Sequence, residues 1–125
     1  MQNSFSYQLL DLQPSQLYIN MDKLTAVQHQ FALNHILEPL PVKKLASKIV
    51  LTDGHTRAFA AFLRGETSLL VYWDNDPLDW AAYEVCVQWC LDVNIHTVAD
   101  FATRIIGTDA YQKLWLDRCR VLHSL

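Results

Sequence analysis

The sequence predicts an α+β fold in which a small mixed sheet is followed by a three-helix extension. Residues 1–73 combine short apolar runs of β type with two helical stretches, whereas residues 74–125 carry only helix signals. A length of 125 residues allows one domain, and residues 74–77 are too few for a flexible linker. We therefore expect residues 1–125 to form a single domain, with the extension packed on the part made by residues 1–73.

Each element of residues 1–73 has its own local signal. Asn20 is a suitable N-cap, and Gly65 is suited to the position just after a helix. Apolar and β-branched runs bounded by turn residues predict the strands. The expected elements are a short strand Leu10–Leu12, a helix Met21–Leu33, an extended stretch Leu40–Leu45, a strand Lys48–Thr52, a helix His55–Leu63 and a strand Ser68–Tyr72.

Three helices are expected in residues 74–125, each announced by a capping residue before apolar periodicity. The first helix is apolar over most of its circumference, so it should be buried against the sheet or covered by a partner. The expected helices run from Pro77, capped by Asp76, to about Leu91; over Val98–Ile106, capped by Thr97; and from the cap Thr108 to about Leu122.

The composition excludes several classes of protein. Apolar residues make up 51% of the chain and charged residues 18%, which excludes a disordered or low-complexity chain. No window approaches about 18 consecutive apolar residues, so we expect no transmembrane helix. The N-terminal residues lack the basic region of a signal peptide. Three cysteines, a small and odd number, favour a reducing, cytoplasmic location over a disulfide framework.

The cysteines are expected to be structural. Cys86 and Cys90 lie four residues apart on one predicted helix, a spacing that two metal ligands could use. A structural zinc site needs about four ligands, however, and no other cysteine or histidine pair has a supporting spacing. We therefore predict that Cys86, Cys90 and Cys119 are reduced, buried and unreactive.

Charge is distributed unevenly along the chain. Residues 74–125 carry eight acidic and four basic residues, so we expect the protein not to bind duplex DNA specifically. The positive charge gathers in residues 43–64, where five lysines and arginines are accompanied by one acidic residue, Asp53. Such a local excess suits one small anion better than a long polyanion.

The segment Asp53–Arg57 carries the clearest chemical signal. A buried strand runs through Gly54 directly into a helix, and the N–H groups at a helix N-terminus attract anions. Gly54 permits the tight turn, Thr56 offers a hydroxyl and Arg57 a planar guanidinium that suits phosphate oxygens. His55 is able to donate a hydrogen bond or move a proton. Asp53 is suited to hold a metal ion or to accept a proton. From spacing alone, a plain turn with a surface arginine is an equally good interpretation.

The stretch Pro14–Trp73, about half of the chain, resembles the ParB/sulfiredoxin superfamily domain. The resemblance rests on three pieces of sequence: Pro14-Ser15-Gln16, Glu38-Pro39-Leu40-Pro41-Val42 and Ile49-Val50-Leu51-Thr52-Asp53-Gly54-His55-Thr56-Arg57-Ala58. It implies that the last piece binds nucleotide phosphates, in agreement with the interpretation of the turn.

Differences from the family pattern indicate which branch of the superfamily the chain resembles most. Sulfiredoxins carry a reactive cysteine directly after the motif glycine, where this chain has His55, so sulfiredoxin chemistry is not expected. Chromosome-partitioning members carry a more basic motif than this one. The version here is most similar to the branch that includes nucleotide-dependent free-serine kinases. Those enzymes use a further acidic residue as a base, for which Asp11, Asp22 and Glu38 are the candidates.

Two classes of function follow. The first is a small enzyme that transfers phosphate between a nucleotide, ADP or ATP with Mg²⁺, and a small hydroxylated metabolite. Gly54, His55, Thr56 and Arg57 would then bind the phosphates, Asp53 would hold Mg²⁺ or act as a base, and His55 would stabilise charge on the transferred group. The second is a noncatalytic nucleotide-sensing or protein-interaction module that uses the same residues. The sequence leaves open whether the chain forms a homo-oligomer.

Overall fold

A computed structural model describes residues 3–34 and 36–123. Its main sheet has four strands in the order β1-β5-β3-β4. Strands β1 and β5 are antiparallel, β5 and β3 are parallel, and β3 and β4 are antiparallel, so the sheet is mixed as predicted. The strands are β1 (Ser4–Gln8), β3 (Leu40–Leu45), β4 (Lys48–Leu51) and β5 (Ser68–Trp73).

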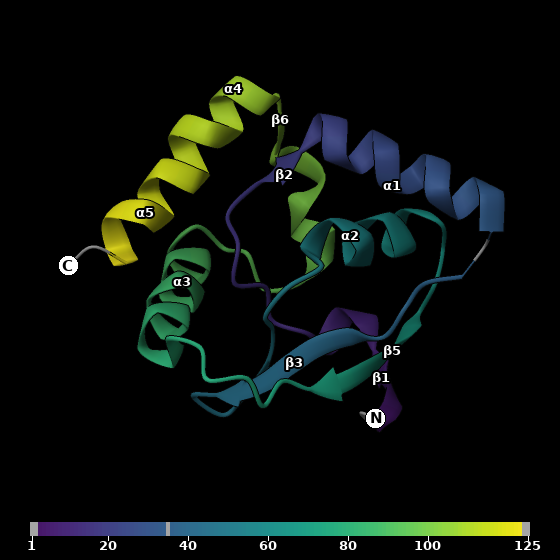
Figure 1. The fold of residues 1–125 in the computed structure, drawn as a ribbon, viewed down its shortest axis with the longest axis horizontal. Helices are drawn as coiled ribbons and strands as arrows, with labels where there is room; N and C mark the ends of the chain where they lie inside the picture. The colour runs from purple at the N-terminus through teal and green to yellow at the C-terminus, as the bar shows by residue number, and fades with distance from the viewer. Residues whose placement is uncertain (1–2, 35, 124–125) are drawn as a thin grey trace.

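Two helices lie over one face of the sheet (Figure 1). Helix α2 (His55–Leu63) lies between the sheet and α1 (Met21–Asn34), and six of its nine residues are buried. The Asn20 side chain accepts hydrogen bonds from the N–H groups of Asp22 and Lys23, at 2.9 and 3.2 Å, which confirms it as a cap. Gly65 follows the α2 C-cap with a φ of 91°, as expected of a residue that ends a helix.

The C-terminal part wraps around the end of the sheet and returns to α1 (Figure 1). Strand β6 pairs in parallel with β2 (Ile19–Asn20), which precedes α1. The elements of this part are α3 (Trp80–Asp92), a 3₁₀ helix η2 (Val98–Thr103), β6 (Ile105–Ile106), and one continuous last helix made of α4 (Thr108–Tyr111), a π-helical turn (Gln112–Leu116) and α5 (Asp117–His123).

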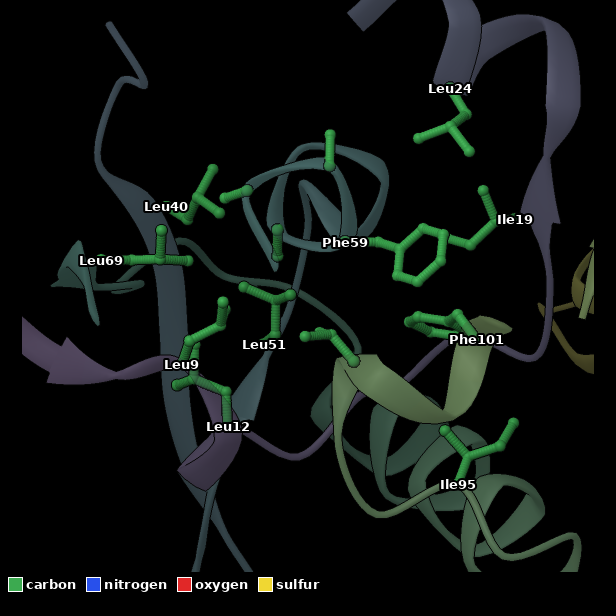
Figure 2. Packing of buried hydrophobic residues seen from close by; sticks show 14 of the residues in the cluster. Leu9, Leu12, Ile19, Leu24, Leu40, Leu51, Phe59, Leu69, Ile95 and Phe101 are labelled. Carbon is green, nitrogen blue, oxygen red and sulfur yellow. The ribbon is translucent and has the colours of Figure 1, made fainter. Parts of the chain in front are cut away.

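One hydrophobic core joins the two parts of the chain. Figure 2 shows Phe59 of α2 and Phe101 of η2 facing each other, with Ile19 and Leu24 on one side and Leu51 on the other. The two phenylalanine rings meet edge to face with centroids 6.1 Å apart, and both side chains are fully buried. Burial of each such side chain contributes about 1.5–3 kcal/mol, so residues 1–73 and 74–125 depend on shared contacts.

The predicted strand Leu10–Leu12 is wrong. Residues Leu9–Asp11 form a 3₁₀ helix, and the strand precedes it as β1. Leu9 and Leu12 are fully buried, whereas Leu10 is 49% exposed. The 3₁₀ turn has a period of three residues, so it places both Leu9 and Leu12 in the core. The adjacent apolar residues Leu9 and Leu10 had suggested a strand instead.

Helix bounds in the C-terminal part also differ from the predictions. Helix α3 begins at Trp80 because the Asp79 carboxylate caps it, accepting from the N–H of Ala82 at 3.1 Å. The helix expected over Val98–Ile106 ends at Thr103, since Ile105 and Ile106 pair with β2 instead. The last helix is preceded by Gly107, so Thr108 is its first residue and not its cap. The capping role of Thr97 is confirmed.

No helix in the described ranges is long and apolar enough to cross a membrane.

Candidate functional site

The turn between β4 and α2 is built around Gly54. Its φ of 77° lies in the left-handed region, and its N–H donates to the Asp53 carboxylate at 2.7 Å. A Cβ at this position would lie 2.7 Å from Leu40 Cδ2 and 2.9 Å from Arg57 Nη2. Both the backbone conformation and the close neighbours therefore require glycine here.

A positive pole forms where α2 begins. The N–H of Ala58 donates to Gly54 O at 2.9 Å, and the three preceding N–H groups belong to the unpaired first turn of the helix. The Arg57 guanidinium folds back to the same point, as its proximity to Gly54 shows. Within the described residues no carboxylate lies close enough to form an ion pair with Arg57. The Asp53 carboxylate accepts the Gly54 N–H at the same turn, so Arg57 is the cation here that has no carboxylate partner among the described residues.

His55 is a buried, neutral side chain. It is 4% exposed, and its Nε2 accepts a hydrogen bond from the N–H of Ser15 at 3.0 Å. Burial lowers the pKa of His55 to about 4; the Asp53 carboxylate opposes this shift and Lys23 adds to it. The accepting Nε2 leaves the ring proton on Nδ1. His55 thus ties α2 to the loop at Ser15, and it carries no positive charge at neutral pH.

The structure divides the predicted site residues between two hollows. Asp53 and His55 line a cavity of about 210 Å³ at the end of β4. Arg57 lines a separate groove of about 370 Å³, together with Glu38 and residues of α1. Thr56 is buried, and neither Thr56 nor Gly54 lines either hollow.

The far wall of the cavity comes from residues that the sequence analysis did not assign to the site. They belong to α3 and the last helix: Ala82, Tyr83, Cys86, Trp115, Cys119 and His123. Burial, with the Asp53 carboxylate, raises the pKa of Tyr83. No local signal connects these positions with Asp53, because tertiary packing alone brings them together.

Burial of the cysteines only partly follows the prediction. Cys86 and Cys90 are buried, as expected, and burial raises the pKa of Cys90 to about 12. Cys119 is only half-buried and lines the cavity, so the prediction of three buried thiols is wrong at this position. It sits near the C-terminal end of a surface helix, where part of its side chain stays open to the cavity.

The turn offers one carboxylate, that of Asp53, as a ligand for a magnesium ion. Asp53 Oδ1 accepts the Gly54 N–H, while the structure gives Oδ2 no such partner. In the described part of the chain no three histidine, cysteine or acidic side chains gather as a metal site. Mg²⁺ in nucleotide sites commonly takes one or two carboxylates together with phosphate oxygens. Asp53 therefore fits a role as a ligand only when a phosphate supplies the others.

Comparison with known proteins concerns the fold. No family model and no curated protein matches the sequence. Protein Atu1540 from Agrobacterium tumefaciens is similar in structure, with a TM-score of 0.57 and 13% identity over 79% of this chain and 61% of that chain. Truncated ParB from Caulobacter crescentus, complexed with CTP-gamma-S, has a TM-score of 0.50 and 17% identity over 74% of this chain and 53% of ParB. Sulfiredoxin from Arabidopsis thaliana has a TM-score of 0.49 and 12% identity over 59% of this chain and 86% of that chain.

The chain has the ParB/sulfiredoxin-like α+β fold. It spans about three fifths of the length of the Agrobacterium protein and about half of the ParB structure. The predicted fold class is confirmed, and so is the resemblance at the level of the fold. The likeness to the free-serine kinase branch stays a prediction.

Proposed function

We propose that the chain binds a nucleotide through its phosphates at the turn Asp53–Arg57. The observation that carries this proposal is the meeting of two positive groups at Gly54, namely the N-terminus of α2 and the guanidinium of Arg57. Backbone N–H groups and a planar guanidinium are the donors that phosphate oxygens accept most readily. The absence of an ion pair to Arg57 among the described residues leaves these donors to a ligand.

The solved neighbours support a nucleotide over a simple anion. The Caulobacter ParB structure, which shares the fold, is complexed with a nucleotide, CTP-gamma-S. The groove lined by Arg57 contains apolar walls from Val27, Phe31 and Leu37, against which a base or ribose would lose water-exposed surface. Resemblance to the kinases favours ADP or ATP, so all three nucleotides belong in the test.

Replacement of Arg57 by alanine tests the binding site. Isothermal titration of the full chain with ADP, ATP and CTP in the presence of Mg²⁺ should give at least about tenfold weaker binding for Arg57→Ala, since a charge-assisted contact is lost. Arg120→Ala is the matched control. Its guanidinium lies on α5, exposed and 3.0 Å from Asp117, away from the groove. Equal affinities of wild type and Arg57→Ala, or no binding by the wild type, would refute the proposal.

One observation favours phosphoryl transfer as a second candidate function. Of the three candidate bases, Glu38 lines the same groove as Arg57. Asp22 instead accepts a hydrogen bond from the Thr108 hydroxyl at 2.6 Å, and Asp11 lines a different groove. We infer that Glu38 is the base that would take the proton of a hydroxylated substrate.

The other roles in such an enzyme are those that the sequence suggested, with Asp53 and Arg57 acting from two separate hollows beside the same turn. Gly54, Thr56 and Arg57 would hold the phosphates, and Asp53 would hold Mg²⁺, which screens phosphate charge when bound. His55 is neutral and its Nε2 is occupied by Ser15, so its part is to hold the turn and to offer a neutral hydrogen bond.

Measuring the phosphorylation of serine distinguishes an enzyme from a noncatalytic nucleotide-binding module. An enzyme should convert serine to phosphoserine with ATP or ADP and Mg²⁺, and Glu38→Gln should lower the rate at least about a hundredfold while nucleotide affinity stays unchanged. Glu66→Gln, at the opposite end of α2, should leave the rate unchanged. Nucleotide binding without turnover by the wild type would reject the enzyme and leave the binding module.

A further inference from the structure

The last helix lies alongside α3 and runs in the opposite direction (Figure 1). Trp89 of α3 meets Trp115 edge to face at 6.3 Å, and the Arg118 guanidinium lies over the Trp89 ring at 3.9 Å. At the other end of the pair, His123 Nδ1 lies 3.7 Å from the Asp79 carboxylate. These contacts hold the two helices in one antiparallel register.

A pair of thiols lies in the middle of this helix pair. The thiols of Cys86 on α3 and Cys119 on α5 are close enough to influence each other's pKa. Both line the cavity that Asp53 and His55 also line. Cys86 is 7% exposed and Cys119 is half-buried, so a small reagent reaches the pair from the side of Cys119.

The third cysteine, Cys90, lies outside this pair and away from the cavity. Cys90, one turn further along α3, is fully buried, does not line the cavity, and donates a hydrogen bond to the carbonyl of Gln16 at 3.3 Å. It therefore serves as an internal reference for an unreactive thiol in the same helix.

The environment of the pair distinguishes its two members. The Cys86 thiol lowers the pKa of Cys119, burial opposes this, and the neighbouring Arg118 guanidinium lowers it further. The Cys119 thiol, together with burial, raises the pKa of Cys86. Cys119 is also the member that is half-buried and open to the cavity, whereas Cys86 is buried, so Cys119 is the thiol that reacts first.

We propose that Cys119 and Cys86 form a redox pair that hydrogen peroxide oxidises to a disulfide, which joins the last helix to α3. The Cys119 thiolate attacks one peroxide oxygen, the O–O bond breaks, and the other oxygen leaves as water after taking a proton, which gives a sulfenic acid. The Cys86 sulfur then attacks the Cys119 sulfur, an S–S bond forms, the S–O bond breaks, and a second water leaves with the Cys86 proton. The two thiols lose two electrons in total, and the peroxide gains them.

The disulfide would covalently join the two helices that form one wall of the cavity. Cys86 and Cys119 come from the two helices that face Asp53 across the cavity, so oxidation fixes the spacing of these helices at that wall. A thiol-reducing agent reverses the change. This inference is independent of nucleotide binding, because none of its residues belongs to the turn Asp53–Arg57.

Peroxide treatment of the full chain followed by non-reducing peptide mapping tests the proposal. The expected product is a Cys86–Cys119 cross-linked peptide pair within single chains, with Cys90 still free for alkylation. Before oxidation, iodoacetamide should alkylate Cys119 at least about tenfold faster than Cys90. The oxidised chain should melt at least about 5 °C above the reduced chain, since the cross-link restricts the unfolded state.

Three serine variants provide the controls. Cys90→Ser should still form the cross-link and gain the same thermal shift, whereas Cys86→Ser and Cys119→Ser should lose both. In Cys86→Ser, Cys119 should stop at the sulfenic acid, which dimedone traps. A Cys86–Cys90 bond, a cross-link between chains, over-oxidised Cys119 beside a free Cys86 in the wild type, or no faster alkylation of Cys119 would each overturn the proposal.

Discussion

At the scale of single residues, His55 shows how burial changes the chemistry of a motif. A histidine beside a glycine turn suggests a proton carrier or a cation for phosphate. In the structure its ring packs edge to face on Phe101 at 6.1 Å and accepts the Ser15 N–H. The side chain therefore connects the turn with the C-terminal part of the chain.

The neutral state of His55 predicts a loss of stability in acid. The folded pKa of about 4 lies below the ordinary 6.5, so the unfolded chain binds the extra proton between these values. The contribution is fully present above about pH 6.5 and is lost as the pH falls toward 4, up to about 3 kcal/mol. Urea unfolding at pH 7 and pH 4.5 should show this loss in the wild type and in His96→Gln, whose histidine is exposed. Equal losses in wild type and His55→Gln would contradict the assignment.

At the scale of elements, the start of α3 shows how two similar signals compete. The sequence predicted Asp76 as the cap, and this prediction is wrong, because Asp79 caps the helix. The N–H of Asp76 donates to the buried carboxylate of Asp74 at 3.1 Å, and Asp74 also accepts from the Thr52 hydroxyl at 3.0 Å. The chain is therefore held in a turn at Asp76, and the helix begins after Asp79.

Alanine substitutions at the two candidate caps should differ in effect. Asp79→Ala removes the acceptor of the Ala82 N–H and should cost about 1 kcal/mol of unfolding free energy. Asp76→Ala removes only an exposed carboxylate and should change stability by less than about 0.5 kcal/mol. Chemical denaturation of both variants measures the difference. A larger loss at Asp76 would restore it as the cap.

The π-helical turn in the last helix also acts at this scale. It lies at Gln112–Leu116 and contains Trp115, which is buried, whereas its neighbours Leu114 and Leu116 are exposed. The wider turn is part of a helix that presents Trp115 and Cys119, four residues apart, to α3 and the cavity. Such turns are frequent at functional sites, which agrees with its place at the cavity wall.

At the scale of the whole molecule, the shared core predicts one cooperative unfolding transition. The fully buried Ile95, Val98 and Phe101 of the C-terminal part belong to the same cluster as Phe59. A chain that ends at Asp74 would expose this side of the cluster to water and should be molten or insoluble. Calorimetry of the full chain and amide NMR of the shortened chain measure the two expectations. Two separate transitions, or a well-folded fragment, would show that the extension is an independent unit.

The same contact can be tested without shortening the chain. Phe101→Ala should cost about 3–5 kcal/mol, because it opens a cavity against Phe59 and His55. Leu116→Ala, on an exposed face, is the control and should change stability little.

Features that depend on near neighbours in the chain were predictable from the residues alone. The helix at His55, its glycine turn, the cap Asn20 and the two strands on either side of α2 follow from local propensity, periodicity and backbone conformation. The fold class followed from the same signals. The segment Leu9–Asp11 was missed because the adjacent apolar residues Leu9 and Leu10 look like a short strand, and the sequence does not show that Leu10 is exposed while Leu9 and Leu12 are buried.

Only the tertiary structure decided how the site is divided and what surrounds it. Burial against Ser15 and Phe101 removed the charge of His55, and packing of α1 against α2 formed the groove that Glu38 and Arg57 share. The thiol pair likewise arises from two helices that are distant in the chain. Free energies of desolvation and of long-range contact depend on the whole packed environment, and no local pattern of residues encodes them.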